Sequence, residues 1–202
     1  MLLAIDHLEA IQLIESPRLI LNDRIVPGEF PRCPDSPYQP EYDWLFQYER
    51  SIAAFLETWL RPYRYELIGE KGILCEALSN SFSHGHNKDP QKPIHVRVLL
   101  GNKGLIVEIE DQGRGFDVYE VYSLYHKKKN YYSTAGNGIR LMAESKNFGI
   151  YHDPEGKIFH LLFLKDGKLE QLPSDVVFAS QARDQEKNSR FFSKSQTYLR
   201  GF

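Results

Sequence analysis

The chain has 202 residues, 42% of them hydrophobic and 26% charged, which is typical of a globular protein that can bury a core without disulfides. A formal net charge of −2 argues against direct nucleic-acid binding, because such binding relies on basic surfaces that release counterions. Cys33 and Cys75 stand in unrelated settings and indicate neither a disulfide framework nor a zinc site. The first residues lack a signal peptide's basic start and a membrane span, so we expect a cytoplasmic protein.

The first sixty residues predict a helix, a strand and a second, longer helix. Apolar spacing over residues 2–15 indicates a short amphipathic helix, although a strand for part of the segment also fits. Residues 18–26 are aliphatic around Asn-Asp and predict a strand or a small hairpin. The proline-rich segment PGEFPRCPDSPYQP predicts an extended or docked loop. Residues 41–60 carry apolar side chains every three or four positions and predict an amphipathic helix that ends before Pro62.

The stretch ILCEALSNSFSHGHN predicts a further helix with a polar stripe. Glu76, Asn80 and His84 follow at intervals of four, which places them on one side of a helix. Gly69 and Gly72 are expected on the same stripe, where each costs about 1 kcal/mol of helix propensity and favours a close approach to the backbone. A carboxylate and an amide aligned in this way can serve one ligand. An ordinary amphipathic helix with a solvated polar face explains the same pattern.

A hairpin follows and ends in a second polar motif. The runs IHVRVLL and LIVEIE alternate around the turn GNKG, which predicts two antiparallel strands. The second strand leads into DQGRGF, where Asp111 precedes Gly113, Gly115 and Phe116. The glycines permit a tight turn near a ligand, and the carboxylate can accept from an amino group such as the exocyclic amine of adenine. Glycine pairs after strands are also common without any function.

The segment that follows the hairpin contains a third motif. Residues 117–135 have no clear period and predict a lid or a disordered loop, whose lysine run is either a solvated patch or a phosphate contact. Gly136, Asn137 and Gly138 then open a helix over residues 139–146, where free backbone N–H groups would favour phosphate.

The remaining chain predicts more sheet and then a tail. Residues 148–152 and 157–164 read as two strands across the turn DPEG, and residues 168–172 read as a possible third. The last thirty residues are polar and end basic.

The three motifs in this order are far more restrictive than any one of them. The chain resembles the ATP-binding domain of the GHKL superfamily, the Bergerat fold of gyrase, related heat-shock chaperones, histidine kinases and anti-sigma factor kinases. EALSNSFSHGHNKDPQKPI and EDQGRGFD are similar to the anti-sigma regulatory factor branch, and the resemblance covers about residues 41–165. Glu76 and Asn80 match the N-box, Asp111, Gly113 and Gly115 match the first glycine box, and Gly136 and Gly138 match the second.

The resemblance implies an α+β fold. We expect a two-layer α/β sandwich with a mixed, mostly antiparallel sheet and helices on one face. Residues 1–40 would be an N-terminal extension, residues 41–172 the ATP-binding kinase domain, and residues 173–202 a polar basic tail.

The resemblance also implies roles for the motif residues. Asn80 would ligate the Mg²⁺ that accompanies ATP, because an amide oxygen suits a hard cation. Glu76 would act as general base toward the attacking hydroxyl, and Asp111 would hold adenine. His84 is either close to the ligand or structural. The expected cofactor-binding residues are Asn80, His84, Asp111, Gly113, Gly115, Phe116, Gly136, Asn137 and Gly138.

The activity implied is that of a serine/threonine kinase in a partner-switching pathway. The expected substrate is a STAS-domain anti-anti-sigma protein, with a sigma factor as a second partner and a homodimer as a further expectation. The main alternative is an ATP-binding module that sequesters its partner without phosphorylating anything, and a third interpretation is an α/β domain with accidental motif matches. Arg140 and the turn at Pro154 depart from the family pattern, which affects lid closure and nucleotide affinity more than the fold.

Overall fold

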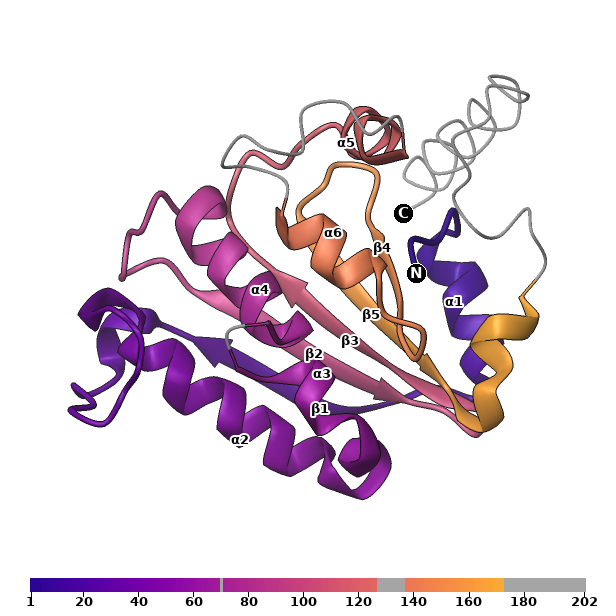
Figure 1. Cartoon of the computed structure of the whole chain (residues 1–202), viewed down its shortest axis with the longest axis horizontal. Coiled ribbons are helices and arrows are strands. Elements are labelled where there is room, and N and C mark those ends of the chain that lie inside the picture. The colour runs from indigo at the N-terminus through magenta and orange to yellow at the C-terminus, as the bar shows by residue number, and fades with distance from the viewer. Residues whose placement is uncertain (70, 127–136, 173–202) are drawn as a thin grey trace.

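One antiparallel sheet organises the computed structural model, which describes residues 1–69, 71–126 and 137–172 (Figure 1). Its five strands lie in the order β1-β2-β3-β5-β4, and every pair is antiparallel. The expected hairpin is present as β2 and β3. The strands are β1 (Arg18–Ile25), β2 (Ile94–Leu100), β3 (Gly104–Glu110), β4 (Gly149–His152) and β5 (Ile158–Leu164).

Helices pack on the sheet as a second layer, which confirms the predicted α+β fold class. Helices α2, α3, α4 and α6 lie over one face, and the amino-terminal helix α1 lies against β3 and β5 from the other (Figure 1). The helices are α1 (His7–Ile14), α2 (Asp43–Leu60), α3 (Arg64–Leu67), α4 (Ile73–Asn80), α5 (Val118–His126) and α6 (Asn137–Ala143). The short 3-10 helices are η1 (Pro27–Glu29), η2 (Pro40–Tyr42), η3 (Arg61–Tyr63) and η5 (Lys165–Gln171), and η4 (Ser81–Gly85) is a short π-helix.

Strand alternation divides the apolar side chains between two cores. Val96 and Val107 point to the inner face, where they join the main core with Leu74 of α4. Ile106 and Leu162 point to the outer face and join a smaller core with α1 and η5. Successive strand residues face opposite sides, so a buried strand with apolar residues on both sides needs a cover on each.

Residues 1–40, predicted as an extension, contribute to this same sheet. Strand β1 forms one edge through its pairing with β2. At the other edge, the Leu3 N–H donates to the Ile150 carbonyl at 2.8 Å, so part of the segment before α1 is extended. Residues 2–15 thus contain both the predicted helix and the alternative extended piece. The predicted tail, residues 173–202, lies outside the described residues.

Several predicted elements differ from the structure. The glycines expected on one long helix instead separate α3 from α4, with Gly69 at φ 88° and Gly72 as the N-cap of α4. Helix α5 occupies residues predicted to be irregular, and residues 127–136 of that loop lie outside the described residues. The strand expected over residues 168–172 is wrong: η5 turns there, with Gly167 at φ 64° and Leu169 in the outer core.

Candidate nucleotide-binding site

Helix α4 presents the first two candidate residues on its half-buried side. Its other positions from Ile73 to Leu78 are buried against the sheet and α2, which fixes the rotation of the helix. Asn80 Nδ2 donates to Glu76 Oε1 at 3.1 Å, so the two side chains meet one helical turn apart. With its nitrogen engaged, the amide group of Asn80 presents its oxygen on the opposite side, where it can ligate a cation.

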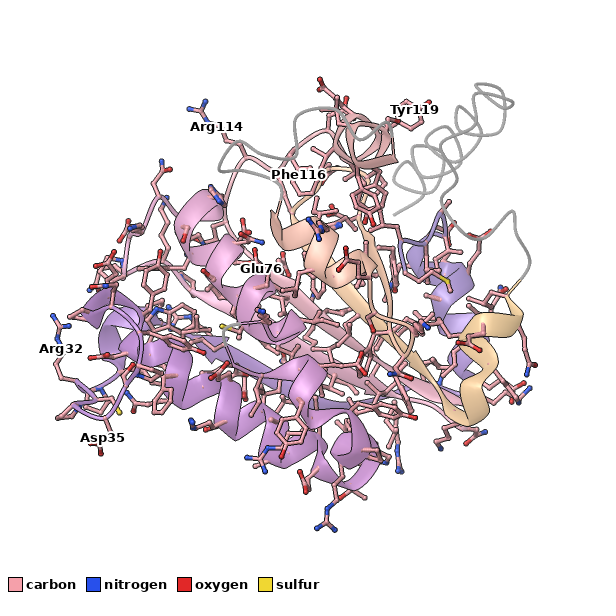
Figure 2. The ribbon with its side chains drawn as sticks, in the orientation of Figure 1. Arg32, Asp35, Glu76, Arg114, Phe116 and Tyr119 are labelled. Carbon is pink, nitrogen blue, oxygen red and sulfur yellow. The ribbon has the colours of Figure 1, made fainter. Side chains whose placement is uncertain are left out.

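Helix α6 approaches these two side chains closely at Gly138. A Cβ at this position would overlap Glu76 Oε1 and lie 3.0 Å from Asn80 Nδ2. Figure 2 shows Glu76 on the side of α4 that faces α6. The structure therefore brings Gly138, from the third sequence motif, into contact with Glu76 and Asn80 of the first motif. Gly136 and the side chain of Asn137 lie outside the described residues.

Asp111 follows β3 and is held by its own turn. Its Oδ1 accepts the Gly113 N–H at 2.7 Å, and a Cβ on Gly85 would overlap its carboxyl group. Burial raises the pKa of Asp111, while the hydrogen bond from Gly113 partly opposes that rise. The glycines at 85 and 113 thus let the backbone close around this carboxylate.

His86 also supports the turn, although the motif spacing did not indicate it. The side chain is buried, and its Nε2 accepts the Gln112 N–H at 3.0 Å. Burial lowers the pKa of His86, which favours the neutral imidazole that can accept this bond. His84, indicated by its four-residue spacing, is exposed and lies in the π-helix η4 that follows Asn80. Its role stays a prediction.

The second half of DQGRGF packs on the turn between β4 and β5. Gly115 has φ 73°, and a Cβ there would overlap the Glu155 carbonyl oxygen, to which Phe116 N–H donates at 3.1 Å. Phe116 is partly exposed, and its ring lies 5.0 Å from that of His152. Burial lowers the pKa of His152 to about 4, so this ring is neutral near pH 7. Figure 2 shows Arg114 and Phe116 at the end of the sheet above Glu76.

Substitution of Gly115 by alanine tests this packing. We expect Gly115→Ala to lower the free energy of unfolding by about 1–3 kcal/mol. The backbone at residue 115 is left-handed, which alanine disfavours, and the new Cβ would overlap the Glu155 carbonyl oxygen. Gly167→Ala is the matched control, since Gly167 also has positive φ but a Cβ added there would meet no atom within 4 Å. Urea denaturation measures the free energy of unfolding of both variants. Equal losses of stability in the two variants would show that the close approach of residue 115 to the Glu155 carbonyl contributes nothing.

The fold and the motifs define a known class of domain. The chain belongs to the histidine kinase-like ATPase domain family, whose profile matches residues 48–158. This match confirms the GHKL resemblance and implies that ATP is the ligand. The matched segment contains all three motifs, but each residue's role within the site stays a proposal.

Within this family, the chain is similar to anti-sigma F factors. The protein of Oceanobacillus iheyensis is 27% identical over 93 residues, and that of Shouchella clausii is 29% identical over 93 residues. Each alignment covers 46% of this chain and 63% of the relative. The protein of Anoxybacillus flavithermus is 30% identical over 70 residues, or 35% of this chain and 47% of the relative. The chain thus spans less than two thirds of these relatives. Among the described residues, no helix is long and apolar enough to cross a membrane.

Proposed function

We propose that this protein is an anti-sigma-type serine/threonine kinase that transfers the γ-phosphoryl group of Mg-ATP to a STAS-like antagonist protein. One observation carries the proposal: Glu76 lies in hydrogen-bond contact with Asn80, where Gly138 approaches both. An intact carboxylate at this position favours a kinase over a module that binds ATP without transferring phosphate. The names of the similar proteins support a regulatory role toward a sigma factor, which would be a second partner.

Glu76 would act on the incoming hydroxyl group. In the proposed step, the serine or threonine oxygen bonds to the γ-phosphorus, its proton passes to the Glu76 carboxylate, and the bond from phosphorus to the bridging oxygen of ADP breaks. The side chain is half-buried, so a substrate hydroxyl can reach it. Its contact with Asn80 keeps the carboxylate beside the position proposed for the metal-bound phosphates.

The other side chains would bind and orient the nucleotide. Asn80 offers an amide oxygen to Mg²⁺ without adding a negative charge next to the phosphates. Asp111 would accept from the adenine amino group, with the turn through Gly113, Gly115 and Phe116 around it. Gly136, Asn137 and Gly138 would present backbone N–H groups to the phosphates at the start of α6.

A direct transfer assay tests the proposal. The full chain is incubated with γ-labelled ATP, Mg²⁺ and a STAS-like protein from the same genome, and we expect label on a serine or threonine of that protein. If ATP binds but no STAS-like protein from that genome becomes labelled, the kinase proposal is overturned. The alternative, a module that sequesters its partner without phosphorylation, is then supported if ATP still promotes complex formation.

Asn80→Ala tests the metal-ligand assignment. ATP at 100 times its Kd should stabilise the wild-type chain by about 2.7 kcal/mol. In Asn80→Ala, most of the ATP-dependent stabilisation that requires Mg²⁺ should be lost. Thermal unfolding with ATP, with and without Mg²⁺, measures the difference. Ser79→Ala, the neighbouring half-buried position on α4, is the control. An unchanged Mg²⁺-dependent shift in Asn80→Ala would remove Asn80 from the site.

A further inference from the structure

A row of polar side chains crosses the outer face of the sheet, opposite the helices α2, α4 and α6. Arg97, Glu108, His160 and Tyr151 are register partners on the adjacent strands β2, β3, β5 and β4. Apolar residues such as Ile106 and Leu162 flank this row on one side, and His95 and Glu110 flank it on the other. Glu108 and His160 are buried and therefore require partners, and helix α1 packs on their strands, β3 and β5.

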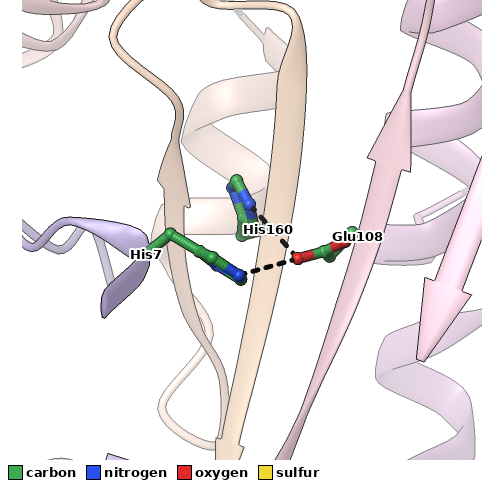
Figure 3. A group of neighbouring side chains, drawn as sticks. All are labelled: His7, Glu108 and His160. Carbon is green, nitrogen blue, oxygen red and sulfur yellow. Dashed lines mark ion pairs between the residues drawn. The ribbon is translucent and has the colours of Figure 1, made fainter. Parts of the chain in front are cut away.

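The row and α1 together bring three metal-ligating side chains to one point. His7 Nε2 lies 3.2 Å from Glu108 Oε1, and His160 Nε2 lies 3.8 Å from the same oxygen. One ligand atom from each residue falls within 4.8 Å of the others. Figure 3 shows both imidazoles directed at this carboxylate from different elements.

We propose that His7, Glu108 and His160 bind a divalent transition-metal ion, with zinc as the best match. Two imidazoles and one carboxylate suit zinc, which leaves a fourth position for water. Zinc bonds of about 2.0–2.2 Å in tetrahedral geometry separate ligand atoms by about 3.3 Å. The distance from His7 to Glu108 already matches this value, and the distance from His160 is slightly longer.

The surrounding side chains orient the ligand atoms. The Tyr151 hydroxyl lies 3.2 Å from His7 Nδ1, which leaves Nε2 for an ion. Arg97 Nε donates to Glu108 Oε2 at 2.6 Å, which directs Oε1 toward the histidines. Partners of this kind commonly fix the orientation of metal ligands. The Arg97 charge also lowers the affinity for a cation, so we expect weaker binding than in a site without it.

The ion pair of His7 and Glu108 does not explain why a second histidine, His160, is buried beside the same carboxylate. The His160 side chain is 3% exposed and stacks on Tyr151 with ring centroids 4.3 Å apart. Among the described residues, its Nδ1 has no hydrogen-bond partner, and its Nε2 is beyond hydrogen-bonding distance of Glu108. A buried imidazole with so few partners is costly, and a metal bond at Nε2 would give the ring one partner, while Nδ1 would stay without a hydrogen bond.

His7 is the ligand that can adjust. Its side chain is 37% exposed and lies in the first turn of α1, whereas Glu108 and His160 are held in neighbouring strands. A small movement of His7 would close the coordination sphere. The bound ion would then tie α1 to β3 and β5 on the outer face, away from the proposed nucleotide site.

Metal binding by the full chain tests the proposal. The chain should carry no polyhistidine tag, and Cys33→Ser removes a partly exposed thiol that could also bind zinc. In excess Mg²⁺, we expect one Co²⁺ per chain with the visible absorption of tetrahedral cobalt, displacement of that ion by Zn²⁺, and a higher melting temperature with Zn²⁺. His7→Ala should weaken metal binding at least 10-fold and remove the tetrahedral cobalt absorption and the zinc-dependent rise in melting temperature.

A histidine from the same face provides the control. His95 lies two residues from Arg97 on β2, so His95→Ala should retain the cobalt absorption and the zinc-dependent shift. His7→Ala is the deciding variant because its side chain is partly exposed, whereas His160→Ala could fail to fold. The proposal is overturned if the parent chain binds no Co²⁺ in tetrahedral form, or if His7→Ala keeps the parent affinity and absorption.

Discussion

Replacement of Glu76 by glutamine should reduce phosphoryl transfer about 10²- to 10⁴-fold while ATP binding changes little. Glutamine retains an oxygen that can accept from Asn80 Nδ2, so the contact at 3.1 Å is preserved. It cannot accept a proton at neutral pH, so the substrate hydroxyl loses its base. Single-turnover transfer from labelled ATP to the STAS-like substrate measures the rate, and calorimetry measures ATP affinity.

A second glutamate variant separates this role from a general effect of charge. Glu144→Gln removes an exposed carboxylate of the i,i+4 pair with Arg140, which should contribute little. Its transfer rate should equal that of the parent chain. Transfer by Glu76→Gln at the parent rate would exclude Glu76 as the base. Loss of ATP binding in Glu76→Gln would instead show that the carboxylate has a structural role.

Asp111→Asn should weaken ATP binding about 10- to 100-fold, because a hydrogen bond to a charged group contributes about 1.5–3 kcal/mol. Aspartate can accept from both the Gly113 N–H and the adenine amino group. Asparagine has only one oxygen, so one of these two contacts is lost whichever way the amide is turned. The loss should therefore appear in calorimetry with ATP.

Comparison with GTP makes the Asp111 test specific. Guanine presents an acceptor where adenine presents its amino group, and an asparagine amide can donate to it. The ratio of ATP to GTP affinity should therefore fall in Asp111→Asn. An unchanged ratio would contradict the assignment of Asp111 to the base.

The pH dependence of ATP binding gives a further check on Asp111. Burial raises the pKa of this carboxyl, and only the ionised form accepts well from adenine. ATP affinity should therefore decline on acidification, starting at a higher pH than for an ordinary aspartate. The part of this dependence that belongs to the Asp111 carboxyl should be absent from Asp111→Asn, so the two chains should differ in slope on acidification.

Local patterns predicted the sheet and the motifs well. Alternation over β2 and β3 and the spacing along α2 follow from side chains that must face a core, so they can be read without knowledge of the rest of the chain. Asp111 and its glycines were found for the same reason, because a strand end and a tight turn are local features.

Features that depend on contacts between distant segments could not be read in this way. Spacing selects His84 but gives no sign of His86, which is buried and accepts the Gln112 N–H of the DQGRGF turn. Gly69 and Gly72 fitted a helix period, but they form the break between α3 and α4. Helix propensity is weak compared with tertiary packing, so a period alone cannot decide such positions.

The sequence by itself determined the class of protein, since the order and spacing of Glu76, Asn80, Asp111 and the glycines belong to one family of ATP-binding domains. Only the tertiary structure placed Gly138 against Glu76 and brought His7 to Glu108 and His160. The first result follows from residues that are close in sequence, whose geometry is set by one helix or one turn. The second depends on how α6 and α1 pack on opposite faces of the sheet, which no local pattern specifies.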